Sequence, residues 1–121
     1  MLFARDAEFD PLPSEALEEV AERTGASVVH RGRAIAALSR RARKDRTVVE
    51  DLLRWATEPE FMQRRWTGFV TLAWVAVLGV GFSQPDEGTR RRLRAVLDRW
   101  DPEEVDDMRA WAKDEPWLRG T

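Results

Sequence analysis

The amino-acid sequence predicts an all-α domain of five or six helices, stacked as antiparallel hairpins in a short solenoid or a compact bundle. Apolar residues recur at helical spacing along nearly the whole chain, and the alternation typical of a β-strand is confined to Ala26–Val29. Only a few residues separate the predicted helices, so consecutive helices should lie antiparallel. At 121 residues the chain fits one domain, residues 1–121, with residues 1–12 as an irregular N-terminal arm.

The first half of the chain contains three predicted helices. The first covers Pro13–Thr24, where apolar residues fall one turn apart, and it ends before Gly25. The second covers Arg33–Lys44 and gathers cations near its C-terminal end, where positive charge suits the helix dipole. The third covers Thr47–Thr57, and Asp45 is placed to cap the exposed N–H groups of its first turn.

A fourth predicted helix begins near Glu58–Glu60 and continues to about Leu78. It contains Trp66–Phe82, a run of seventeen residues without a charge, which would extend about 25 Å as a helix and fall short of a bilayer core of about 30 Å. We therefore expect Trp66–Val80 to be the central buried helix. An oligomer interface and membrane insertion are the alternatives, and a membrane is the less expected partner.

Two further helices complete the predicted fold. A fifth covers Asp86–Arg99 after the break at Pro85. The sixth starts at Asp101-Pro102-Glu103-Glu104, which has the spacing of a capping box and places proline at the first helical position.

A pattern repeats after 56 positions. Each copy has a cap, a helix with inward Val and Trp, an acidic turn and then an aromatic residue, so that Asp45 and Trp55 correspond to Asp101 and Trp111. A helical hairpin cannot bury its apolar face alone, so equivalent hairpins stack and need equivalent contact residues. We therefore expect Trp55 and Trp111 in similar surroundings; the alternative is chance matching in a biased composition.

The basic helix followed by TVVEDLLRWATEPEFMQRRW resembles a HEAT-type α-helical repeat. Over about residues 31–119 the chain is similar to the HEAT-like repeats of bacterial DNA alkylation repair proteins. The resemblance implies a scaffold of stacked helices. Proteins of that family cradle DNA on a concave basic face, with aromatic and acidic residues near the damaged nucleotide. No catalytic aspartate of the family can be matched in this chain, so no catalytic residue is carried over.

The net charge of −2 conceals a strong segregation of charge. Residues 1–30 carry two Arg against seven acidic residues, residues 31–100 fifteen Lys and Arg against eight, and residues 101–121 three against seven. The basic middle either binds an anionic partner or pairs with the acidic ends within the fold. Candidate residues for a partner or for phosphates form two clusters, Arg31, Arg33, Arg40, Arg41, Arg43 and Lys44, and Arg90, Arg91 and Arg94.

Aromatic residues give a second set of candidates. Trp100 and Trp117 stand beside predicted turns, where each either closes a helix start by packing or offers an exposed ring to a partner. Asp107 and Trp111, like their counterparts 56 positions earlier, are four residues apart and share a helix face. Such a pair either recognises a cationic or damaged base or consists of a buried Trp beside a solvated Asp.

Enzyme chemistry has little support in the sequence. His30 is the only histidine, cysteine is absent, and no glycine-rich phosphate loop is present. We therefore expect no catalytic residue, cofactor, metal or disulfide, and a cytoplasmic location. The sequence favours a non-catalytic helical-repeat interaction module that binds a protein partner or a second copy of itself. The alternatives are nucleic-acid binding through the two arginine clusters and kinship with a DNA base-repair enzyme.

Overall fold

The computed structural model describes residues 2–113, and most of them are helical, which confirms the predicted all-α fold class. Residues 2–13 contain neither a helix nor a strand and form an N-terminal arm. Within the described range there are seven helices and two short strands, namely α1 Ser14–Glu22, α2 Val28–Arg41, α3 Arg46–Trp55, α4 Pro59–Gln63, β1 Arg65–Thr67, β2 Val70–Thr71, α5 Leu72–Phe82, α6 Glu87–Asp98 and α7 Pro102–Trp111.

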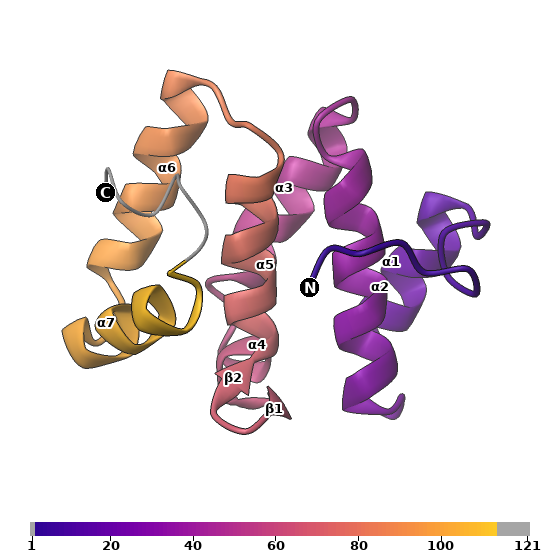
Figure 1. Ribbon diagram of the computed structural model, residues 1–121, viewed down its shortest axis with the longest axis horizontal. Coiled ribbons are helices and arrows are strands. Elements are labelled where there is room, and N and C mark those ends of the chain that lie inside the picture. The colour runs from indigo at the N-terminus through magenta and orange to yellow at the C-terminus, as the bar shows by residue number, and fades with distance from the viewer. Residues whose placement is uncertain (1, 114–121) are drawn as a thin grey trace.

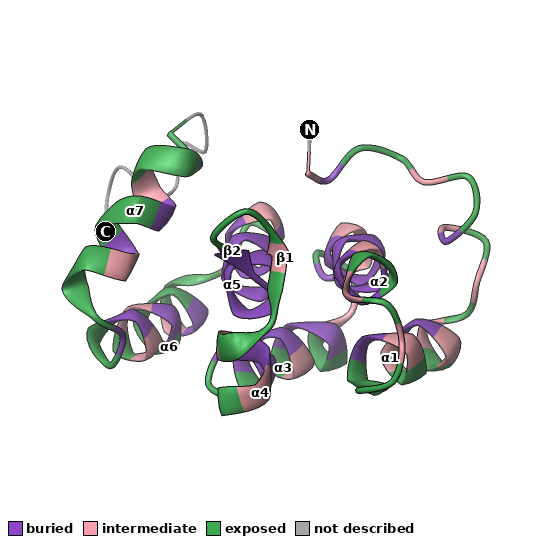
Figure 2. Cartoon of the chain, turned by 90° about the horizontal axis from the view of Figure 1, so that it is seen from below, coloured by how far each residue is buried: buried purple, intermediate pink, exposed green. Residues whose placement is uncertain are grey.

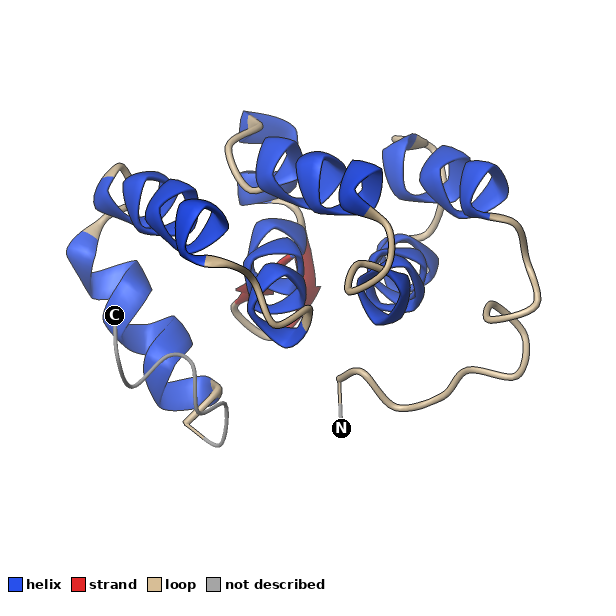
Figure 3. Ribbon diagram, turned by 90° about the horizontal axis from the view of Figure 1, so that it is seen from above, coloured by secondary structure: helices blue, strands red, loops and turns tan. Residues whose placement is uncertain are grey.

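The helices, labelled in Figure 1, lie in two layers that Figure 3 shows edge-on. One layer contains α1, then α3 with α4, and then α6; the other contains α2, α5 and α7, as Figure 2 labels them. Each helix of the second layer follows a first-layer helix in the chain, so the fold consists of helical hairpins placed side by side. Helix α5 is central, because it contacts α2, α3, α4 and α6.

Helix α5 is buried on all sides. Every residue of Leu72–Gly81 is buried, and Figure 2 shows this helix in purple between its neighbours. A helix that is apolar all round must be enclosed in this way. The predicted central helix is thus correct from Leu72 onward and wrong for Trp66–Thr71. That stretch forms the antiparallel hairpin β1–β2, which turns at Gly68 with a φ of 54°.

The length of α5 bears on the membrane alternative. Its 11 residues extend about 16 Å, roughly half of a bilayer core of about 30 Å. No helix within residues 2–113 combines the length and the apolar character that a membrane span requires.

Helix α2 begins at Val28, five residues before the predicted start, and Ser27 caps it by accepting a hydrogen bond from Val29 N at 3.2 Å. It therefore contains Gly32. A Cβ atom on Gly32 would lie 2.3 Å from Nε1 of Trp66, a residue of β1. The glycine thus lets the hairpin pack closely against the helix.

The predicted helix caps are confirmed. The carboxylate of Asp45 accepts a hydrogen bond from Thr47 N at 3.0 Å, and that of Asp101 accepts one from Glu103 N at 2.8 Å. The capping box at the start of α7 differs in its second half. Glu104 Oε1 accepts a hydrogen bond from Trp74 Nε1 at 2.9 Å, so this side chain joins α7 to α5.

The predicted equivalence of Trp55 and Trp111 is wrong. Trp55 is fully buried and stacks on Phe61 with ring centroids 5.5 Å apart, whereas Trp111 is 42% exposed. Helix α3 lies in the layer of α1 and α6, but α7 lies in the layer of α2 and α5 (Figures 2 and 3). The 56-residue similarity therefore reflects two helices with similar caps and apolar stripes, and it does not mark equivalent positions in a repeat.

Candidate interaction surfaces

The acidic N-terminal arm neutralises part of the basic helix α2. Arg33 donates from Nε to Asp6 Oδ2 at 2.8 Å and from Nη2 to Asp6 Oδ1 at 2.9 Å, and Arg40 forms an ion pair with Asp10. These hydrogen bonds from Arg33, followed by those from two backbone amides, lower the pKa of Asp6 from 3.8 to about 2 against the opposing effect of burial. Arg33 and Arg40 were candidate phosphate contacts, and the structure shows that their charges are compensated within the fold.

Arg41 holds the arm through uncharged acceptors. Its Nη1 donates to Ser14 Oγ at 3.0 Å, and its Nη2 donates to the backbone carbonyls of Asp10, at 2.7 Å, and Leu12. The guanidinium is therefore fixed in place, but no carboxylate of residues 2–113 forms an ion pair with it.

Arg31 is a buried structural residue, which corrects its prediction as a surface contact. It is 1% exposed and donates from Nε to the carbonyl of Ala21 at 2.9 Å. Its two Nη atoms donate to the carboxylate of Glu60, and its guanidinium lies 5.0 Å from the ring centroid of Phe61. These contacts join α1, α2 and α4 and leave Arg31 out of reach of a partner.

The arginines of α6 also divide into residues that are paired within the fold and residues that are not. Arg94 pairs with Glu87 at 3.2 Å, and Arg92 makes two hydrogen bonds to Glu50 of α3. Arg90 and Arg91 are exposed and have no partner within the described part of the chain.

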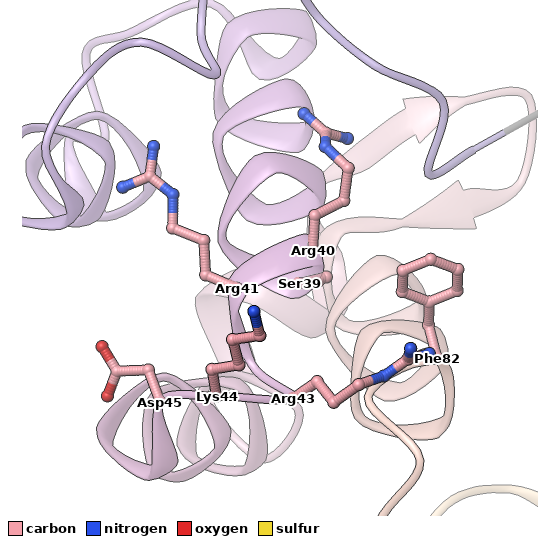
Figure 4. A pocket seen from close by; sticks show the side chains of 7 residues that line it. All are labelled: Ser39, Arg40, Arg41, Arg43, Lys44, Asp45 and Phe82. Carbon is pink, nitrogen blue, oxygen red and sulfur yellow. The ribbon is translucent and has the colours of Figure 1, made fainter.

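The cations at the C-terminal end of α2 surround a hollow, shown in Figure 4. We call it the basic pocket; it has a volume of about 580 Å³ and is lined by Ser39, Arg40, Arg41, Arg43, Lys44, Asp45 and Phe82. Arg43 and Lys44 are exposed, and neither has a partner among residues 2–113. Of the first predicted cluster, these two cations are therefore the ones that can meet a ligand without breaking an existing bond.

A second hollow lies between the β1–β2 hairpin and α7. We call it the acidic groove; it has a volume of about 440 Å³, and the side chains that define it are Phe69, Trp74, Asp101, Glu103, Glu104 and Asp107. Arg65 is the one cation that the described residues contribute to its lining. Four carboxylates against one guanidinium give this groove a negative field at neutral pH.

Phe69 is the feature of the acidic groove that the sequence did not reveal. It is 58% exposed at the tip of the hairpin and contacts the ring of Trp74 edge-on, with centroids 5.6 Å apart. The sequence predicted a continuous buried helix here, in which Phe69 would be covered, because an apolar run does not distinguish a helix from a strand pair. The Asp107 and Trp111 pair was visible in the sequence, and both side chains are exposed on α7.

Trp100 is a packing residue, which corrects its prediction as an aromatic contact. It is 4% exposed, and its Nε1 donates to the carbonyl of Ala56 at 3.2 Å. Its indole therefore closes the junction of α6 and α7 onto the end of α3, which is the packing role that the sequence favoured over an exposed ring. Trp117 lies outside the residues that the structure describes.

Within residues 2–113, no group of three or more His, Cys, Asp or Glu side chains is arranged to hold a metal ion. Comparisons of the chain with protein-family models, with curated proteins and with solved structures gave no match. The functional inference therefore depends on the chemistry of the basic pocket and the acidic groove.

Proposed function

We propose that this protein is a non-catalytic interaction module that binds a lysine- or arginine-bearing segment of a partner protein in the acidic groove. The observation that carries the proposal is the exposure of Phe69, 58% of whose surface meets solvent beside unpaired carboxylates. A large aromatic residue surrounded by polar residues is typical of the centre of a protein interface.

The charges of the groove favour a basic occupant. The carboxylates of Glu103 and Asp107 have no partner within the described part of the chain. Asp101 and Glu104 accept hydrogen bonds from Glu103 N and Trp74 Nε1, which are uncharged donors. Opposite charge on a partner would speed its association and exclude acidic competitors.

The aromatic wall supplies the apolar part of the binding energy. Covering the exposed part of Phe69 is worth about 1 kcal/mol, since full burial of a Phe side chain contributes roughly 1.5–3 kcal/mol. The aliphatic stem of a lysine or arginine suits such a wall, and its cation is attracted to the exposed face of Phe69. Trp111, which is 42% exposed, lies one turn after Asp107 on α7.

The walls of the groove are held by contacts to the core. The hydrogen bond from Trp74 to Glu104 joins α5 to α7, and Trp66 of β1 packs on Gly32 of α2. We also propose that the scaffold is of the HEAT type, because its helical hairpins lie side by side in two layers (Figure 3). A preformed groove reduces the conformational entropy that is lost on binding.

The apolar contact is tested with Phe69→Ala. The probe is a short synthetic peptide in which lysine alternates with leucine, and the affinity is measured by fluorescence anisotropy. We expect Phe69→Ala to weaken binding about fivefold, equivalent to about 1 kcal/mol. Val29 is 50% exposed at the start of α2, so Val29→Ala is the matched control and should leave the affinity within about twofold.

The electrostatic contact is tested with Asp107→Asn against Asp106→Asn. Both residues are exposed on α7, but only Asp107 lines the groove. We expect Asp107→Asn to weaken binding more, and the difference to shrink at high salt. Equal losses would mean that only net charge matters, which contradicts the proposal. A dimer in sedimentation that Phe69→Ala dissociates would make a second copy the occupant instead.

A further inference from the structure

The basic pocket lies at the opposite end of α5 from the acidic groove. Trp74 of the groove is in the first turn of α5, and Phe82 of the pocket is its last residue. Eight residues of helix separate them by about 12 Å along the axis. The basic pocket is therefore a surface separate from the acidic groove.

Positive charge in the pocket exceeds what the fold compensates. The ion pair with Asp10 balances Arg40, but Arg41, Arg43 and Lys44 have no carboxylate partner among the described residues. Within residues 2–113, Asp45 is the one acid in the lining, and its Oδ1 already accepts hydrogen bonds from Thr47 N at 3.0 Å and Thr47 Oγ1 at 2.6 Å. The lining thus has three uncompensated cations and one carboxylate.

We propose that the basic pocket binds a phosphate ester attached to a flat apolar group, as in a mononucleotide. The donors for the phosphate are Arg43, Lys44 and Nη1 of Arg40, because Asp10 engages only Nε and Nη2 of Arg40. Guanidinium groups match the geometry of phosphate oxygens and form charge-assisted hydrogen bonds with them.

The arm prepares the pocket for its ligand. Asp10 and the carbonyls of residues 10 and 12 fix the guanidinium groups of Arg40 and Arg41, so little side-chain entropy is lost there on binding. Figure 4 shows that the Arg43 side chain extends toward Phe82.

Phe82 provides the apolar wall. Its ring is partly exposed and stacks on Phe3 of the arm, with centroids 4.6 Å apart and planes 24° from parallel. An aromatic surface beside phosphate donors suits a nucleobase, which stacks on aromatic rings. The volume of about 580 Å³ lies within the range of about 300–1,000 Å³ that small-molecule sites occupy.

The test compares two double variants of the full chain. Arg43→Gln with Lys44→Gln removes the free donors of the pocket. Arg99→Gln with Lys113→Gln removes the same charge from two exposed cations outside it, neither of which has a partner within the described range. All four side chains are exposed, so we expect both variants to fold, and melting curves check this. The probes are adenosine monophosphate, inorganic phosphate and a fluorescent single-stranded oligonucleotide.

We expect adenosine monophosphate to bind more tightly than inorganic phosphate. The pocket variant should lose about tenfold or more in affinity, and the control about twofold at most. If the oligonucleotide binds more tightly than the mononucleotide, and the pocket variant loses the same factor in affinity for it, the phosphate belongs to a nucleic-acid strand. If the oligonucleotide and the mononucleotide bind with similar affinity, the ligand is a free nucleotide. Equal losses in both variants, or no binding of any probe at low salt, would overturn the proposal. Phe69→Ala should leave nucleotide binding unchanged, which separates this test from that of the groove.

Discussion

Neighbouring cations on α2 and in the turn after it have different roles because their surroundings differ. Arg31 is enclosed between three helices, Arg33 and Arg40 are paired with the arm, and Arg43 and Lys44 face solvent. The same residue type is therefore part of the core, an anchor of the arm or a free donor. Which role applies depends on the acceptor that tertiary packing brings near.

Arg31→Ala should destabilise the protein by about 3 kcal/mol, because it leaves the carbonyl of Ala21 without its side-chain donor, leaves Glu60 with Arg64 as its remaining donor and opens a cavity. Urea unfolding followed by circular dichroism measures this loss. Arg23→Ala is the control, since Arg23 and Glu19 form an exposed ion pair that is worth less than about 0.5 kcal/mol. A similar loss in the two variants would contradict the structural role of Arg31.

Asp6→Asn should make stability less dependent on pH in the acid range. The native pKa of Asp6 is about 2, below its ordinary value of 3.8, so its contribution is complete above about pH 4 and is lost as the pH falls toward 2. The difference in unfolding free energy between the natural chain and Asp6→Asn should therefore be largest near neutral pH and small at about pH 2. A difference that stays constant over this range would show that the ion pair with Arg33 is not its source.

Local features of single residues could be predicted from the sequence, and distant partners could not. The caps at Asp45 and Asp101 depend on atoms two residues away, so spacing alone identifies them. The partners of Arg31 and Arg33 lie 29 and 27 positions away. Segregated charge gave pairing of the basic middle with the acidic ends as one of two alternatives, but it did not identify the arginines that remain free.

At the level of elements, close helix packing depends on glycine. Gly79 of α5 faces α2, where a Cβ atom at this position would lie 2.1 Å from Ser39 Oγ and 2.9 Å from Ser39 Cβ. Helix α5 can approach α2 at this point only because the residue has no side chain. The two helices form one of the main contacts in the core.

Gly79→Ala should destabilise the protein by about 1–3 kcal/mol, although alanine is the better helix former by about 1 kcal/mol. Gly25→Ala is the control, because a Cβ at Gly25 meets nothing within 4 Å and its φ is not positive. That change should be neutral or stabilise by up to about 1 kcal/mol. The urea midpoints of the two variants should therefore move apart, and a stabilised Gly79→Ala would contradict the close approach of α2 and α5.

The elements that the sequence failed to predict are those defined by their neighbours. Trp66–Thr71 has the apolar composition of a buried helix, but it forms a hairpin whose Trp66 packs on Gly32 of α2. Likewise, α3 and α7 have similar sequences and lie in different layers. Helix type and order follow from local pattern, whereas the layer in which a helix lies depends on contacts across the chain.

At the scale of the whole molecule, acidic and basic segments are only partly matched. The acidic arm compensates Arg33 and Arg40 of α2, and Glu50 and Glu87 compensate Arg92 and Arg94 of α6. Among residues 2–113, Glu103 and Asp107 of α7 and Arg43 and Lys44 of the basic pocket remain unpaired, at opposite ends of α5. The overall charge of −2 therefore hides two local fields of opposite sign.

The central claim, that the acidic groove is the protein-binding face, is tested most directly by amide chemical-shift mapping of the ¹⁵N-labelled chain with the lysine–leucine peptide. We predict that the largest shifts fall on the β1–β2 hairpin, around Phe69, and on the first two turns of α7, and that Phe69→Ala weakens the response. Shifts that cluster around Arg43 and Lys44, or that spread evenly over the chain, would contradict it.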